Sequence, residues 1–151
     1  MTPLRSARRS MAVLTAGLAL SLAGGSALAG DAPIQEEIGM EIPDGEFSAC
    51  KTITTVPGNK LLVVESVSLN VSPGPGTSGQ ILVSTFLKPE LDGKSISFQL
   101  TPKLTPDLGF IDSRLVRLYA DSTLQFCAAR SAPATGLWHF VVGISGVLTH
   151  Q

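Results

Sequence analysis

The sequence has few residues of the kinds on which most enzymes and nucleic-acid-binding proteins depend. Charged residues make up 15% of the 151 residues and aromatic residues 5%, with one tryptophan, one tyrosine and two histidines. A formal net charge of −1 gives no basic surface for a nucleic-acid partner. With so few histidines, no convergent set of metal ligands is expected. The composition therefore predicts a protein without metal or cofactor, and without the residues of an enzyme active site.

The sequence also has no obvious membrane-spanning run. The apolar stretch at residues 11–23 is well short of the roughly 20 residues that a span needs. Three arginines precede it within residues 1–10, and an Ala-Leu-Ala pattern follows at 27–29. This order of charged, apolar and small residues is typical of a secretory signal peptide. We expect residues 1–29 to be removed, which leaves a periplasmic or secreted bacterial protein with no transmembrane anchor.

The expected mature chain begins with an acidic segment, residues 30–46. Removing the signal leaves 8 basic and 12 acidic residues, a net charge of −4, and six of those acids precede Phe47. Ile34, Ile38, Met40 and Ile42 lie at even positions of this segment. The alternation fits an edge strand or an extended arm, and a partly ordered terminus is the interpretation we favour. An arm of this kind could also be donated to a neighbouring subunit.

Only two cysteines are present, Cys50 and Cys127, and both lie in the expected exported part. Disulfides form and persist outside the cytoplasm, and two cysteines allow a single internal pairing. We therefore predict a Cys50–Cys127 disulfide. Two free thiols or an intermolecular bridge remain the alternatives.

Residues 47–151 read as short strands separated by Gly/Pro turns, and long helical patterns are absent. In residues 61–71 the apolar side chains fall mainly at odd positions, which is the period of a strand with one buried face. Glu65 occupies one of these inward positions and requires an arginine partner or a slip in register. The strand count of about seven predicts an all-β fold, an antiparallel β-sandwich or a jelly-roll-like barrel.

The candidates for chemistry are few. His139 lies in the last predicted strand and is expected to be an outward or half-buried strand residue, and Trp138 is in phase with the core residues. Glu65, Arg117 and Tyr119 are the candidates for a ligand-facing surface, although an ion pair or edge exposure is the role that we favour for Glu65. One aromatic beside one arginine makes a small platform, so no catalytic, cofactor or metal residue is assigned.

Three segments of the sequence resemble segments of small, uncharacterised exported bacterial proteins. They are VPGNKLLVVESVSL, RLYADSTLQFCAAR and the ending GISGVL, within residues 50–149. The resemblance implies a β-sandwich in the bacterial envelope and no activity. Val147 stands where that group has an aromatic residue.

These observations favour a non-enzymatic exported module that binds a protein or small molecule, or supports an assembly. Self-association is possible because an exposed β face with little charge invites it. The alternatives are a fimbria-like subunit that donates residues 30–46, and a small hydrolase that uses Glu65 or His139.

Overall fold

The computed structural model describes residues 31–74, 83–105, 109–130 and 136–151. The predicted signal peptide lies outside these ranges. Within them the chain forms ten strands and two antiparallel sheets. No helix in the described part of the chain is long and apolar enough to cross a membrane.

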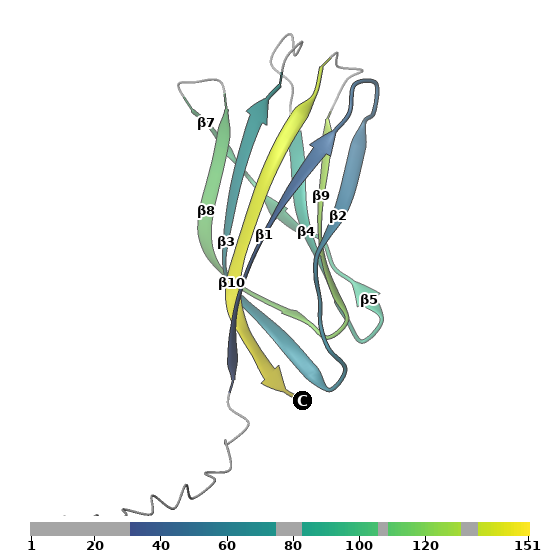
Figure 1. The fold of residues 1–151 in the computed structure, drawn as a ribbon, viewed down its shortest axis with the longest axis vertical. Coiled ribbons are helices and arrows are strands. Elements are labelled where there is room, and N and C mark those ends of the chain that lie inside the picture. The colour runs from purple at the N-terminus through teal and green to yellow at the C-terminus, as the bar shows by residue number, and fades with distance from the viewer. Residues whose placement is uncertain (1–30, 75–82, 106–108, 131–135) are drawn as a thin grey trace, which may run out of the picture.

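Figure 1 shows the arrangement of the strands. The strands are β1 (Ala32–Ile42), β2 (Ser48–Thr55), β3 (Lys60–Pro73), β4 (Val83–Leu91), β5 (Lys94–Ser95), β6 (Phe98–Leu100), β7 (Lys103–Leu104), β8 (Phe110–Ala120), β9 (Thr123–Arg130) and β10 (Trp138–His150). Seven are long and three contain only two or three residues. Six of the long strands were predicted; the seventh, β1, was not, and the predicted strand at residues 95–100 is reduced to the short β5 and β6.

The two sheets face each other across one core. Sheet I has the order β1-β10-β3-β8-β7, and sheet II has the order β2-β9-β4-β5, with β6 also paired to β4. In Figure 1, β8 lies at one side of sheet I and β1 crosses toward β2 at the other. The two-residue turn Asp92-Gly93 joins β4 to β5, and both residues have positive φ, as expected for a tight hairpin.

The core forms because alternate side chains of each strand point between the sheets. Val67, Leu69 and Val71 of β3 meet Phe126 of β9 and Phe140 of β10 in one buried cluster. The rings of Phe126 and Phe140 lie 5.8 Å apart. Trp138 is 3% exposed, so its predicted place in the core is confirmed.

A β-bulge at Glu65 explains why the predicted alternation of β3 fails there. Ser145 pairs with Ser66 and Gly146 with Val64, so Glu65 is an extra residue that β10 does not oppose. The bulge moves the inward phase from Leu62 and Val64 to Val67 and beyond. Glu65 is therefore exposed, and the expectation that it lies on the inward side is wrong.

The acidic segment is a regular edge strand. All eleven residues of β1, from Ala32 to Ile42, pair with β10 of the same chain. Met40 and Ile42 are buried in the core, and Ile34 and Ile38 pack partly against it. The favoured interpretation, a partly ordered terminus, is thus wrong, because the alternating apolar side chains complete the core of sheet I.

Arg130 fixes the connections at one end of the two sheets. It is 4% exposed, and its guanidinium donates to the carbonyls of Glu46, Gly136 and Pro43 at 2.6, 2.8 and 2.7 Å. Hydrogen bonds from a charged donor are stronger than neutral ones. Arg130 therefore holds the β1–β2 connection against the start of the last strand.

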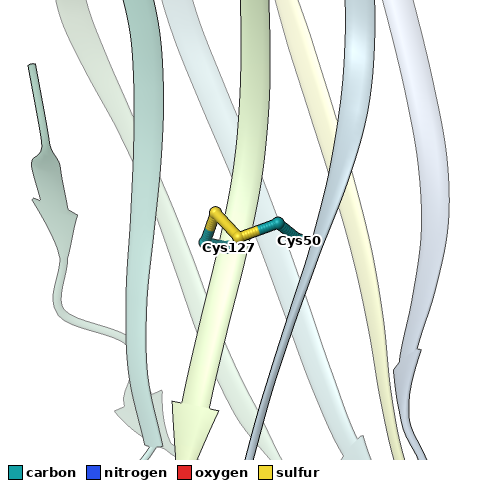
Figure 2. Close-up of a disulfide and its surroundings, with 2 residues drawn as sticks. All are labelled: Cys50 and Cys127. Carbon is teal, nitrogen blue, oxygen red and sulfur yellow. A yellow bond between two sulfur atoms is a disulfide. The ribbon is translucent and has the colours of Figure 1, made fainter. Parts of the chain in front are cut away.

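The predicted disulfide joins Cys50 and Cys127 (Figure 2). The two residues are direct partners in the β2–β9 ladder, with their Cα atoms 4.1 Å apart. The bridge connects neighbouring strands of sheet II and closes a separation of 77 residues.

Candidate binding face

The outer face of sheet I, the side away from the core, is the part of the described surface that departs most from a simple polar face. Directly paired residues of antiparallel strands place their side chains on the same face. Pairing across β1, β10, β3 and β8 therefore orders this face into four rows. The rows are Gly39-Val141-Asn70-Ile111, Glu37-Gly143-Ser68-Ser113, Gln35-Ser145-Ser66-Leu115 and Pro33-Val147-Val63-Tyr119.

A groove of about 470 Å³ crosses the two middle rows, and small side chains form its floor. Gly143 lies at the centre, where an added Cβ would come within 2.7 Å of Ser68 Oγ. Ser66 and Ser145 share a hydrogen bond of 2.7 Å between their hydroxyls, and Ser68 Oγ donates to the Gly143 carbonyl at 3.5 Å. The floor is thus polar in composition, but most of its hydroxyl hydrogens are already used within the sheet.

An apolar ridge runs along β8 beside this groove. Leu115 is 86% exposed, Ile111 53% and Tyr119 39%, all on the outer face of sheet I. Val141 of β10 is also exposed and shares a row with Ile111. Isolated exposed apolar residues are common, but four on one sheet face mark a candidate interaction surface.

The three residues expected on a ligand-facing surface lie close together here. Register places Glu65 opposite Val116 and Arg117, where a second irregularity interrupts the β3–β8 ladder, and Tyr119 pairs with Val63 just beyond. All three side chains are exposed at the end of the ridge.

Of the two alternatives expected for Glu65, an arginine partner or a slip in register, the structure shows the slip. Among the described residues, the Glu65 side chain makes no ion pair or hydrogen bond, Arg114 pairs with Asp112, and Arg130 is occupied by carbonyls. The bulge, rather than an ion pair, explains how an acidic residue is tolerated in the middle of β3. Its outward position lets water solvate the carboxylate, so no counter-ion is required.

His139 forms a second polar feature at the β1 side of the same face. Its Nδ1 lies 3.0 Å from Glu41 Oε1, so the carboxylate orients the ring. A pocket of about 580 Å³ adjoins this pair and is also lined by Cys50 and Lys51, whose Nζ donates to the Gly39 carbonyl at 2.7 Å. Sequence reasoning placed His139 on the strand surface but had no means of finding Glu41.

This pair lacks the remaining parts of a nucleophilic site. Ser72 is the cross-strand partner of His139, but within the described residues no hydrogen bond joins the two side chains. The described part of the chain also contains no group of three or more His, Cys, Asp or Glu residues placed to hold a metal ion. The arrangement can orient an imidazole, and it shows no activated nucleophile.

The groove itself was missed at the level of sequence. Ser66, Ser68 and Asn70 are visible as outward residues of one strand, which is a signal for a polar face and nothing more. Their proximity to Gly143 and Ser145 depends on the β3–β10 register across more than 70 residues of sequence. Comparison with known proteins offers no guide to its role, because no protein-family model matches the sequence and no curated protein matches it significantly.

Proposed function

We propose that this chain is an exported, non-enzymatic β-sandwich module of the bacterial envelope whose binding face is the outer face of sheet I. The observation that supports the proposal best is the apolar ridge of β8 beside the groove over Gly143. A sheet that faces only water does not require an 86% exposed leucine beside a hollow lined by serines.

Two further observations fit an exported binding protein. The Cys50–Cys127 disulfide belongs to oxidising compartments such as the periplasm or the extracellular space. The signal-peptide pattern at residues 1–29 agrees with this location. The His139–Glu41 pair lies on an open surface, which suits contact with a ligand better than acid–base catalysis sheltered from water.

The test is a native mass spectrum of the protein recovered from the periplasm of an expressing bacterium. We expect a chain that begins at Gly30, is two hydrogens lighter than the reduced mass, and carries additional bound mass. The Ser68→Trp variant fills the groove and should lose that bound mass. Thr52→Trp, at an exposed position of β2 in sheet II, is the matched control and should keep it.

Three results would contradict the proposal. A bare monomer from the periplasm would show that the face holds no partner there. Bound mass that survives Ser68→Trp would place the binding site elsewhere. A chain that keeps residues 1–29, or remains in the cytoplasm, would refute export.

A further inference from the structure

We infer that the partner of this face is a second copy of the chain, packed face to face about a two-fold axis that runs along β3. The inference rests on the proposed function, because it uses the same face and names its occupant. In this arrangement the β3 strands of the two copies lie opposite each other. Each β8 lies over the partner's β10, and the sheets pack about 10 Å apart.

The row order makes the face complementary to itself. Rotation about β3 keeps each row at its own height and exchanges the outer residues of β10 and β8. Val141 then faces Ile111 of the second copy, and Val147 faces Tyr119. The small pair Gly143 and Ser113 come together, and Leu115 lies over Ser145. Apolar residues thus meet apolar residues, and the most exposed leucine meets the hollow.

Each serine hydroxyl of the groove keeps one hydrogen bond within the sheet when Leu115 enters. Ser66 and Ser145 already bond to each other, and Ser68 bonds to the Gly143 carbonyl. Burial of a hydroxyl is costly mainly when its hydrogen bond is lost. Two of the three hydroxyl hydrogens are already used within the sheet, so the floor can take an apolar side chain without losing those bonds.

Charge and area also agree with a second copy. The rotation sets β1 of one copy over the partner's β7, where Lys103 lies in the row of Gly39, between the rows of Glu37 and Glu41. A basic residue therefore faces the acidic strand twice in the symmetric pair. The three strands that face the partner, β10, β3 and β8, are spaced about 4.8 Å apart and over about nine residues cover roughly 440 Å² per copy. The total of roughly 900 Å² is typical of weak, transient interfaces, so a weak dimer is expected.

Edge-to-edge pairing is less suitable because both edges of sheet I are protected. On β1, Lys51 Nζ donates a hydrogen bond to the Gly39 carbonyl, so this oxygen is not free for an added strand. Pro33 of the same strand has no backbone N–H to donate. On β8, strand β7 covers Phe110 and Ile111, and charged Asp112 and Arg114 follow. Short cover strands, proline and charges are the usual protection against strand addition. No strand of the described chain covers the outer face.

The experiment is sedimentation velocity of the mature, disulfide-bonded protein across a concentration series up to the millimolar range. We expect a monomer–dimer equilibrium that Leu115→Arg weakens by about 30-fold or more, the size of a central contact. Ile96→Arg is the matched control, because Ile96 is 61% exposed in the β5–β6 connection and lies outside the proposed interface. It should leave the dissociation constant unchanged.

Cross-linking tests the two-fold axis directly. Because β3 faces itself, Asn70→Cys should be joined to the same position of a second copy by a short bis-maleimide reagent. Thr52→Cys, exposed on sheet II, should not be joined above the background of colliding monomers. Circular dichroism of each variant checks that the fold is retained.

Each outcome decides the inference. A monomer throughout the concentration series, or a dimer that Leu115→Arg leaves intact, would overturn it. If the protein is monomeric but native mass spectrometry shows a different bound mass that Ser68→Trp removes, the dimer fails and the proposed binding function stands. If neither a second copy nor another mass binds the face, both proposals fail.

Discussion

The outer faces of the two sheets differ in what they expose. On sheet II the central row is Cys50-Cys127-Phe86-Gln99, in which a covalent bridge joins two strands. On sheet I the corresponding surface has a groove floored by Gly143 and serines, with Leu115 projecting beside it. Under the proposed function, sheet II contributes covalent stability and sheet I provides the binding surface. Variants that change the stability of the fold without changing its association, or the reverse, test these separate roles of the two sheets.

The largest expected effect is removal of the disulfide on sheet II. Replacing Cys50 and Cys127 together by alanine should lower the free energy of unfolding by about 4 kcal/mol, because the unfolded chain loses a long cross-link. Urea unfolding of the mature protein measures the change, with chemical reduction of the wild type as the control. The folded double variant should still sediment as the wild type does. A loss below about 1 kcal/mol would contradict the role given to sheet II.

The next effect concerns Arg130, which lies away from the outer face of sheet I. Arg130→Met should destabilise the protein by about 3 kcal/mol, because three carbonyls lose a charged donor. Arg117→Met is the matched control on the exposed ridge and should change stability by less than about 0.5 kcal/mol. If thermal unfolding shows the same loss of stability for both variants, Arg130 has no greater structural role than an exposed arginine.

Substituting two glycines of β10 in turn compares a position packed against backbone, Gly146, with a position in the open groove, Gly143. An added Cβ at Gly146 would lie 2.0 Å from the Val63 carbonyl oxygen, whereas at Gly143 the nearest atom is the movable Ser68 Oγ. Gly146→Ala should therefore cost about 2 kcal/mol, the range for overpacking. Gly143→Ala should cost clearly less, because Ser68 can rotate away. Equal losses in urea unfolding would show that the bulge does not bring the backbones together.

The smallest effect is expected at the bulge residue. Glu65→Gln should change stability by less than about 0.5 kcal/mol, because the side chain is exposed and without an ion pair among the described residues. Asp112→Asn is the control on the other side of β8, since Asp112 accepts from Arg114 and from the Thr101 backbone N–H. It should cost about 1 kcal/mol or more. A larger loss at Glu65 would restore the abandoned idea of a structural ion pair.

The predicted parts of the fold depended on local patterns. Alternation in residues 110–120 correctly placed Val116 and Leu118 toward the core and Tyr119 outside. The Asp92-Gly93 turn was also visible, because few residue pairs suit positive φ. The disulfide followed from having only two cysteines in a chain expected to be exported. The resemblance to exported bacterial proteins, and the signal peptide itself, remain predictions.

The incorrect expectations share a physical cause. An edge strand such as β1 and a loose terminus have the same alternating, acidic sequence, and only pairing with β10 distinguishes them. The same is true of Glu65, where local alternation assumes an unbroken ladder and cannot show a bulge. Partners that lie far away in sequence determine both outcomes.

By itself, the sequence determined that this protein is all-β and that its two cysteines could pair, because strand period, turn residues and cysteine number are local or compositional properties. Only the tertiary structure decided which side chains share the outer face of sheet I. The groove over Gly143, the ridge at Leu115 and the His139–Glu41 pair all arise from cross-strand register between distant segments. Register is set by how every strand completes the common core, and that requirement cannot be read from any one segment.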